Sequence, residues 1–184
     1  MPYIPPHKRQ RKINKPKRHE YRYKSIVIPY IETKYNNKTY KSYVLVEDAK
    51  FKEFTFVVGG CKKNEHMSTC ALRELKEETR GVFGNISKDA LYAGFQFDSK
   101  ERSPAERKKD DIEGVDVTMR YIVYYLRLDM TKTSFNDFRK RFADVRPMKE
   151  EYNETSDIVL KTKSELQKAK MWSFMKEKVL IKLP

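Results

Sequence analysis

Three glutamates in the first half of the chain are spaced so that their carboxylates share one face of a helix. Glu74, Glu77 and Glu78 stand at i, i+3 and i+4, and such positions are neighbours on a helix surface. Their mutual repulsion destabilises a helix, whereas a divalent cation would turn it into binding, because Mg²⁺ and Mn²⁺ prefer carboxylate oxygens. The spacing therefore predicts a site for Mg²⁺ or Mn²⁺. The alternative is an acidic surface helix without a ligand.

A strand, a glycine turn and a helix are expected to position these carboxylates. Residues 54–60, FTFVVGG, are typical of a strand that ends at a glycine pair. The helix is expected over residues 67–80, where Met67, Ala71 and Leu75 recur at helical spacing. These three residues predict a buried face that anchors the helix on a sheet.

The other elements are expected to build this sheet and cover it. Asn36-Asn37 indicates a turn, and the charged residues 98–114 favour a mobile surface loop. Runs rich in β-branched and aromatic residues predict further strands over 25–31, 42–48, 91–97, 115–129 and near 156–160. The irregular alternation of strands and helices indicates one α/β or α+β domain with a mixed sheet between helices.

Capping signals predict two more helices. One is expected to begin at Ser134 as N-cap, with Asp137 in the place of the capping-box acid. The last helix is expected to open at the pair Thr162 and Glu165 and to continue through Trp172 to Phe174 or Met175.

The charge of the chain is concentrated at its N-terminus. The 184 residues include 40 Lys and Arg against 26 Asp and Glu, a net charge of +14. Residues 1–24 alone carry nine Lys or Arg and one acid, Glu20. We expect a basic N-terminal arm over 1–24 before a domain over 25–184, with Tyr21 and Tyr23 favouring RNA or polyphosphate contact. A solvated tail and a merely charge-rich surface are the alternatives.

Composition bounds the cellular setting. The two cysteines, Cys61 and Cys70, make no disulfide framework and fit a reducing compartment. Because no apolar run approaches ~20 residues and no secretory signal is present, we expect a cytoplasmic protein without a membrane partner.

The spacing around the glutamates resembles the Nudix box, the signature of Nudix hydrolases. The box reads G-x5-E-x7-R-E-U-x-E-E-x-G-U, where U is aliphatic, and every fixed position from Gly59 to Glu78 is matched. The chain departs from the box at its end, because Thr79 and Arg80 separate Glu78 from Gly81 where the family usually has one residue. We interpret this difference as a slightly lengthened helix exit that leaves the carboxylate face intact.

The resemblance implies a Nudix-like α/β/α sandwich and hydrolysis of a nucleoside diphosphate linked to another group. It implies that Glu77 and Glu78 are the main metal ligands, and that Glu74 is a further ligand or positions water. Arg73 would orient the neighbouring carboxylates through charge-assisted hydrogen bonds. Glu65 would form an ion pair that holds the loop to the helix.

Glycines and a late acid complete the implied site. Gly59 and Gly60 would let the backbone approach the metal or phosphate, where a Cβ would intrude. Nudix enzymes often add an acid from late in the domain, and here an acidic cluster spans residues 150–157. We favour Glu154, then Glu151, as the added ligand or general base. An exposed acidic loop is the alternative.

The box does not select the substrate. As a basic single domain rich in Lys, Tyr and Asn, the chain is similar to compact Nudix proteins of large DNA viruses, including poxvirus-like mRNA-decapping enzymes. That viral resemblance implies cleavage of the 5′ cap of mRNA with release of m7GDP. Lys62, Lys63, Arg22 and Lys24 are expected to contact the capped RNA or another polyphosphate substrate.

Aromatic side chains would stack on a methylated guanine, whose positive charge gains from a π face. The candidates are Tyr30, Phe95, Phe97, Tyr125 and Trp172, although aromatic residues of this kind are more often core residues than part of a cap pocket. Two other functions stay open: a pyrophosphatase for diphosphoinositol polyphosphates or nucleotide sugars, and a catalytically silent RNA-binding protein on a Nudix scaffold.

Overall fold

A mixed β-sheet forms the centre of the molecule. The computed structural model describes residues 17–102, 104–145 and 154–184, and within them the sheet has seven strands. The strands are β1 (Arg18–Tyr35), β2 (Lys38–Asp48), β3 (Phe54–Thr55), β4 (Val57–Gly60), β5 (Leu91–Ser99), β6 (Val115–Arg127) and β7 (Thr155–Thr162). β1 pairs in parallel with β6, while β2 and β4 pair antiparallel with β1. β5 lies beyond β6, and both β3 and β7 pair with β2.

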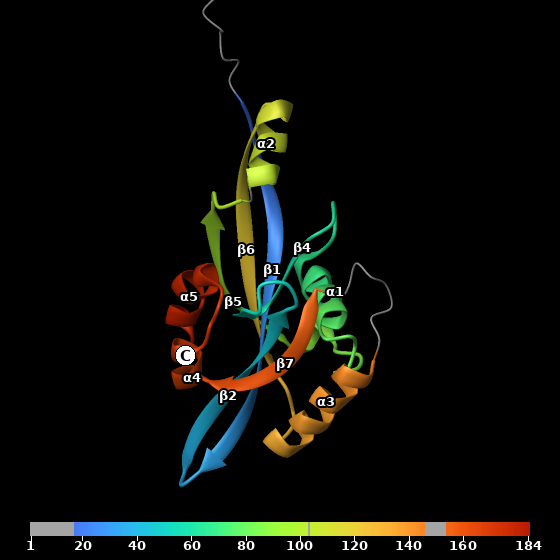
Figure 1. Ribbon diagram of the computed structural model, residues 1–184, viewed down its shortest axis with the longest axis vertical. Helices are drawn as coiled ribbons and strands as arrows, with labels where there is room; N and C mark the ends of the chain where they lie inside the picture. The colour runs from blue at the N-terminus through green and yellow to red at the C-terminus, as the bar shows by residue number, and fades with distance from the viewer. Residues whose placement is uncertain (1–16, 103, 146–153) are drawn as a thin grey trace, which may run out of the picture.

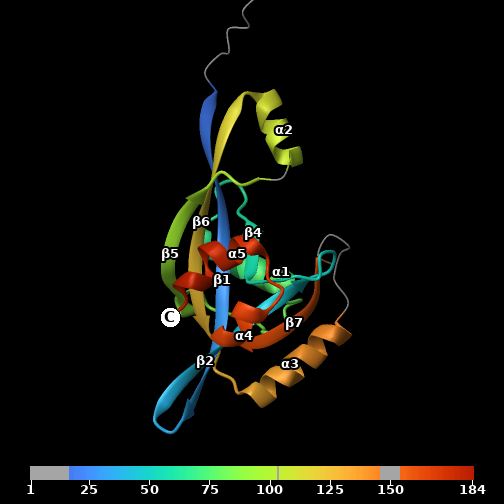
Figure 2. The ribbon, with the colours of Figure 1, turned by 60° about the vertical axis from the view of Figure 1, so that its left-hand side comes forward.

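Helices cover both faces of this sheet (Figure 1). They are α1 (Met67–Glu78), α2 (Pro104–Glu113), α3 (Lys132–Asp144), α4 (Lys163–Lys168) and α5 (Ser173–Lys178). Figures 1 and 2 show α1 and α3 on one side, α4 and α5 on the other, and α2 beside the upper ends of β1 and β6. The expected α/β/α arrangement in one domain is therefore confirmed. Short 3₁₀ turns at Lys88–Ala90 and Leu180–Lys182 complete the described structure.

Alternate side chains of β1 pack into two hydrophobic cores, one on each face of the sheet. Successive side chains of a strand point to opposite faces of its sheet. Val27 and Ile31 pack with Leu75 of α1 and with α3. Ile26 and Ile28 pack instead with residues of α4 and α5. Since Leu75 lies against the sheet, α1 has a fixed rotation and the acidic side chains occupy its other faces.

Two local signals in the sequence are confirmed. Asn36 and Asn37 both take positive φ, 48° and 57°, as a tight turn between two antiparallel strands requires. Thr162 and Glu165 form a capping box at the start of α4, in which each side chain bonds the backbone N–H of the other residue.

The prediction of a loop over residues 98–114 is wrong, because Pro104–Glu113 forms α2. The prediction rested on the scarcity of apolar residues, but charge holds this helix in place. Asp110 is fully buried, and it accepts hydrogen bonds from Arg22 of β1 (2.8 Å) and from Arg102. A buried carboxylate with two guanidinium partners attaches α2 to the sheet.

Two helix boundaries also differ from the prediction. The N-cap of α3 is Thr131, and Ser134 stands at the third helical position of the same capping box. The single last helix is in fact two, because the chain between α4 and α5 runs beside β3. There Phe54 donates its N–H to Lys170 and accepts the N–H of Trp172, so those residues cannot be helical.

Part of the segment assigned to the basic arm belongs to the sheet. Residues 18–24 form the start of β1, where they pair with β6. Residues 1–16 lie outside the described part of the chain, so the arm's role in binding stays a prediction. Among the described helices, none combines the length and the apolar character that a membrane crossing requires.

Candidate active site

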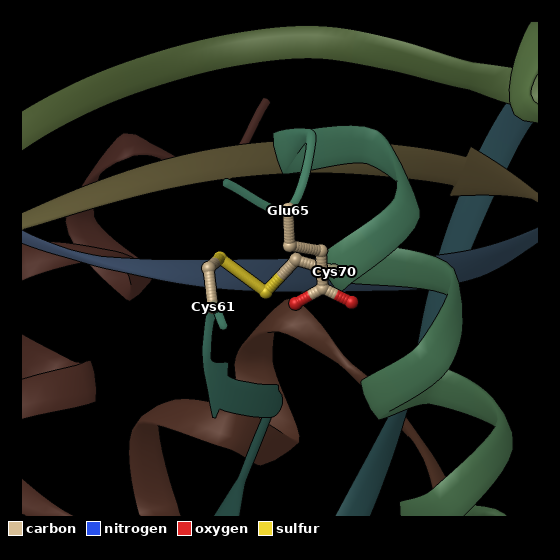
Figure 3. A group of neighbouring side chains, drawn as sticks. All are labelled: Cys61, Glu65 and Cys70. Atoms are coloured by element: carbon tan, nitrogen blue, oxygen red, sulfur yellow. A yellow bond between two sulfur atoms is a disulfide. The ribbon is translucent and has the colours of Figure 1, made fainter. Parts of the chain in front are cut away.

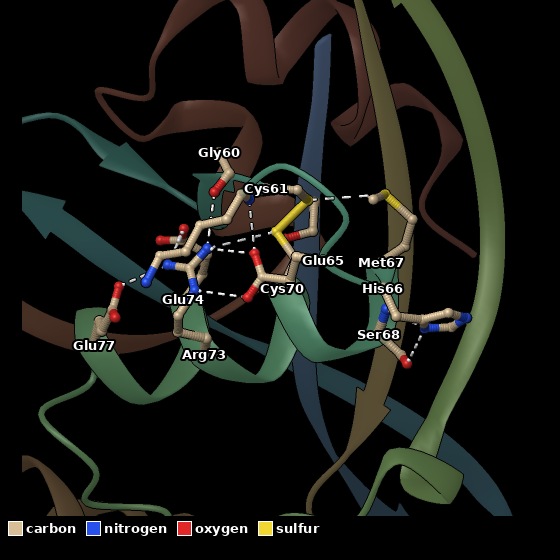
Figure 4. The surroundings of a disulfide bond; sticks show 12 residues. Gly60, Cys61, Glu65, His66, Met67, Ser68, Cys70, Arg73, Glu74 and Glu77 are labelled. Carbon is tan, nitrogen blue, oxygen red and sulfur yellow. Dashed lines mark hydrogen bonds and ion pairs between the residues drawn. A yellow bond between two sulfur atoms is a disulfide. The ribbon is translucent and has the colours of Figure 1, made fainter.

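Arg73 is the centre of the hydrogen bonds at this site (Figure 4). Its Nε and Nη2 donate to the two carboxylate oxygens of Glu65 at 2.9 and 3.0 Å. Its Nη1 donates to Glu74 at 2.6 Å and to Glu77 at 2.9 Å, and its Nη2 also donates to the carbonyl of Gly60 at 2.8 Å. One guanidinium therefore fixes three carboxylates of the box against the end of β4.

The carboxylates around Arg73 differ in their titration because they differ in burial. Hydrogen bonds from Arg73, together with the backbone N–H of Lys62, lower the pKa of Glu65 to about 2. Glu74 is more deeply buried, and the cost of burying its charge raises its pKa despite the bond from Arg73. Glu65 is therefore a fixed anion, whereas Glu74 is a carboxylate whose charge needs further compensation.

Gly59 is required by the position of Glu74. A Cβ on Gly59 would lie 1.8 Å from Cδ of Glu74, a distance at which the carboxylate must move. A Cβ on Gly60 would meet no atom within 4 Å. The first glycine of the pair thus makes room for the Glu74 carboxylate, and the second does not.

Glu78 has no cationic partner among the described residues. Burial raises its pKa to about 7, although the Thr155 hydroxyl donates a hydrogen bond to its carboxylate. Negative charge on Glu154, Glu74 and Asp48 raises the pKa further. A cluster of carboxylates with this little compensation can hold a divalent cation.

A cavity of about 330 Å³ opens beside Glu78. We call it the acidic cavity, because four of its lining residues are carboxylates: Asp48, Glu53, Glu78 and Glu154. Aromatic side chains line it as well, and they are Phe51, Phe56 and Trp172. None of the described residues that line it is Lys or Arg.

Most of the aromatic candidates are packed into the structure. Tyr30, Phe95, Phe97 and Tyr125 pack against the core on the α4 and α5 side of the sheet. Trp172 differs, because it is 37% exposed and lines the acidic cavity. It is the one of the five that a ligand in this cavity can touch.

The interpretation of a lengthened helix exit is wrong, because α1 does not continue past Glu78. α1 ends at Glu78, and Arg80 takes the left-handed conformation, with φ of 52°, where the box has glycine. The N–H groups of Arg80 and Gly81 bond the carbonyls of Glu77 and Lys76, which closes the helix end. The side chain of Arg80 stacks on the ring of Phe142 and donates to carbonyls at the end of α3 and the start of β7.

The expectation that the cysteines stay unpaired is wrong, because Cys61 and Cys70 form a disulfide (Figure 3). The bond joins the residue after Gly60 to the first turn of α1, and the Cys70 sulfur lies 3.9 Å from Nη2 of Arg73. With Glu65 these cysteines are close enough to form a metal-binding group. Their sulfurs are bonded to each other and Glu65 is held by Arg73, so the carboxylates around Glu78 are the better candidates for a metal site.

The residues expected to bind substrate are spread around the site. Lys62 and Lys63 are exposed in the loop before α1. Arg22 is engaged by Glu20 and Asp110, on the side of β1 that α2 covers. Lys24 stands opposite Gly60 in the pairing of β1 with β4. Of the late acids, Glu154 lies at the acidic cavity, and Glu151 falls outside the described residues.

Three of the residues that the sequence analysis missed line the acidic cavity. Asp48 ends β2, Phe51 follows in the next loop, and Thr155 begins β7. The available signal for Phe51 was an aromatic residue between two lysines, and its side chain is indeed exposed. The other two gave no signal, because only the pairing of β2 with β7 brings them to Glu78.

The sheet, its helix layers and the strand–loop–helix segment define the class, which is the Nudix fold. No protein-family model matches the chain, and no curated protein sequence matches it either. Solved structures of Nudix proteins, however, superpose on most of it.

Three of these structures show the extent of the likeness. The Ap4A hydrolase of C. elegans, in a binary complex, has a TM-score of 0.50 at 16% identity and covers 88% of this chain and 93% of its own. The NUDIX domain of Shewanella oneidensis NrtR, complexed with ADP ribose, has a TM-score of 0.54 at 9% identity, with 87% and 84% covered. The Bacillus subtilis pyrophosphohydrolase BsRppH has a TM-score of 0.51 at 18% identity, with 86% and 75% covered. At such identities the likeness establishes the fold.

Proposed function

We propose that this protein is a metal-dependent hydrolase of phosphoric anhydride bonds. The observation that carries the proposal is the group of carboxylates Glu78, Asp48 and Glu154, which line one cavity and have no cationic partner among the described residues. The group lies on a Nudix fold, and Glu78 has with Glu74 and Glu77 the spacing that the Nudix box requires. A polyanionic substrate could approach these carboxylates only if cations neutralised both sides.

The carboxylates fit Mg²⁺ or Mn²⁺ because hard divalent cations take oxygen ligands. Glu74, Glu77 and Glu78 would hold the metal, and the backbone at Gly59 would lie next to it. When bound, the metal neutralises the pyrophosphate and lowers the pKa of a water molecule. Arg73 holds Glu74 and Glu77 in place, so that little reorganisation is needed when substrate binds.

Glu154 is the proposed general base. It is exposed at the acidic cavity and is close enough to Glu78 to affect its titration. The backbone of Ala49 donates to its carbonyl at 2.7 Å, which fixes the chain where the side chain begins. A carboxylate at this place can accept a proton from water without losing an ion pair.

The substrate we favour is the 5′ cap of mRNA, cleaved to m7GDP in the cytoplasm. A methylated guanine is a positively charged aromatic ring with N–H donors, so it suits a cavity lined by aromatic rings and carboxylates. Phe51 would stack on the ring, the edge of Trp172 would contact it, and Glu154 or Glu53 would accept its N–H groups. The volume of about 330 Å³ falls within the range of small-molecule sites.

The same lining argues against a diphosphoinositol polyphosphate. Such a substrate needs several Lys or Arg side chains, and the described lining of the acidic cavity has neither. A decapping enzyme of the large-DNA-virus type fits the cavity and the basic charge of the chain better.

Labelled substrates test the proposal. RNA carrying a labelled cap is incubated with the protein and Mg²⁺ or Mn²⁺, with Glu78→Gln as the inactive control, and release of labelled m7GDP is expected. Hydrolysis of dinucleoside polyphosphates or nucleotide sugars without m7GDP release would refute decapping but keep the hydrolase. RNA binding without hydrolysis of any pyrophosphate would make the protein a silent Nudix scaffold.

A further inference from the structure

A second concave surface adjoins the acidic cavity. It has a volume of about 840 Å³, and its lining residues come from β1, β5, β6, α2, α5 and the segment before α2. Two of the elements that line it can be located in Figure 1, where α2 lies at the upper end of β1 and β6 and α5 lies lower. Trp172 lines this surface and the acidic cavity alike, so the two are neighbours at this side chain. We call this surface the basic groove.

The groove carries five Lys or Arg side chains against three carboxylates. Two of its cations are already engaged, since Lys100 pairs with Asp116 and Arg102 with Asp110. The other three, Lys24, Arg107 and Lys178, make no ion pair with any carboxylate in the described part of the chain. They come from three different elements, and this leaves three separate positive groups available to a ligand.

Aromatic rings lie beside these cations. The Trp172 and Phe174 rings stack at 4.8 Å between centroids, and Phe174 contacts Tyr121 at 5.0 Å. Phe174 and Tyr121 are buried, whereas Trp172 is 37% exposed at the edge of the groove. The supported indole therefore offers a flat surface on which a base can stack.

The groove also begins next to the Nudix box. Lys24 is the register partner of Gly60, whose carbonyl accepts a hydrogen bond from Arg73. Lys24 therefore places one cation of the groove on the strand beside the box, while α2 and α5 carry the other two. Positive groups on separate elements suit a chain with repeating negative charges.

We infer that the basic groove binds single-stranded RNA, namely the nucleotides that follow the hydrolysed anhydride. This inference rests on the proposed function, because it assigns the groove to the body of the same substrate. Unpaired cations bind phosphates and the indole stacks on a base, a combination typical of single-strand binding sites. An acidic peptide would use the cations but would gain nothing from the indole.

A double substitution with a matched control tests the groove. Arg107→Ala with Lys178→Ala removes two exposed cations of the groove. Lys34→Ala with Lys38→Ala removes two exposed cations from the β1–β2 hairpin, at the opposite end of the molecule from α2. Both variants lose the same charge, so a difference between them reports on position. Equal thermal midpoints would show that both variants keep the fold.

The first measurement is the affinity for an uncapped 20-nucleotide single-stranded RNA as salt is varied. The groove variant is expected to bind roughly tenfold more weakly than the hairpin variant at low salt. Its salt slope should fall by about 0.7 for each phosphate contact that is lost. Equal affinities and slopes for the two variants would overturn the inference. The inference would also be overturned if the groove variant bound RNA as well as the hairpin variant does but no longer bound a poly-glutamate peptide.

The second measurement compares hydrolysis of a capped 20-nucleotide RNA with that of a cap dinucleotide. The groove variant should raise KM severalfold for the long RNA and leave the dinucleotide unchanged. An equal change for both substrates would overturn the inference. If wild-type protein hydrolyses no cap while the difference in RNA affinity persists, the proposed function fails and the groove remains an RNA-binding site.

Discussion

The carboxylates on and near α1 form two groups, which differ in the partners that compensate their negative charge. Glu65, Glu74 and Glu77 all accept hydrogen bonds from Arg73. Glu78 is partly buried near Asp48 and Glu154, and among the described residues the hydroxyl of Thr155 is its one hydrogen-bond donor. Arg73 thus gives the first group a cationic partner, whereas Glu78 has none among the described residues. We propose that Arg73 fixes the position of Glu74 and Glu77, and that the uncompensated charge of the second group adds affinity for a cation.

The sharpest test of this difference is Glu78→Gln. The amide keeps the volume of the side chain and an oxygen that can accept from Thr155, but it removes the charge. We expect kcat to fall on the order of 10²- to 10³-fold, as when one charge-stabilising group of an active site is lost. Release of product from a labelled pyrophosphate measures the loss, and activity near the wild-type level would refute the role of Glu78.

The same variant should be more stable than the wild type above neutral pH when a chelator is present. Folding raises the pKa of Glu78 from 4.5 to about 7. Its contribution to stability is therefore full below pH 4.5 and is lost as pH rises to about 7. The whole change is on the order of 3 kcal/mol. Urea unfolding at pH 5 and pH 8 measures it, and identical pH dependence in both proteins would contradict the pKa.

Gly59→Ala tests the first group by moving Glu74. The new Cβ would lie 1.8 Å from Cδ of Glu74, so the carboxylate must leave its place on Arg73. Because small displacements of catalytic groups are costly, activity should fall by about 10²-fold. Gly60→Ala is the matched control, since its Cβ meets nothing within 4 Å. If both variants lose activity equally, the close approach to Glu74 is not the cause.

The two groups also differ in how far the sequence could predict them. The face with Glu74, Glu77 and Glu78 follows from helical spacing within one short segment. The partners of Glu78 could not be predicted from local spacing. Thr155 is 77 residues away in the sequence, and only the pairing of β2 with β7 brings it to Glu78. The disulfide depends in the same way on the path of the loop, which spacing alone does not determine.

Helix α2 was not predicted for the same reason, because the contact that anchors it is distant in the sequence. Its sequence has little apolar character, and its anchor is the ion pair of Asp110 with Arg22, 88 residues earlier. Local periodicity cannot show such a contact. The central sheet and its covering helices were predictable because their apolar patterns are strong and local.

Arg73→Lys keeps the positive charge at the centre of the first group and removes its geometry. A lysine has one nitrogen, so it cannot donate to Glu65 through two atoms and also hold Glu74 and Glu77. We expect metal affinity and activity to fall by about 10- to 100-fold, the usual effect of losing a group that orients metal ligands. Lys76→Ala, at an exposed position of the same helix, is the control. Unchanged metal affinity in Arg73→Lys would show that charge alone suffices.

The smallest effect on activity is expected from breaking the disulfide. Cys61 and Cys70 are separated by nine positions, so closing this short loop should stabilise the fold by about 2–3 kcal/mol. The bidentate pair of Arg73 with Glu65 holds the same loop and survives reduction, because it involves neither sulfur. Activity should therefore change less than about threefold while the urea midpoint falls.

Dithiothreitol and a double variant measure that difference. The wild type should lose stability on reduction, whereas the double variant Cys61→Ser with Cys70→Ser should not respond to the reductant. If reduction instead lowers activity as much as Arg73→Lys does, then the disulfide, and not the guanidinium, positions the loop. In that case the first group of carboxylates would depend on the redox state of the protein. Adding Cys61→Ser and Cys70→Ser to Arg73→Lys would then lower activity no further than Arg73→Lys does alone.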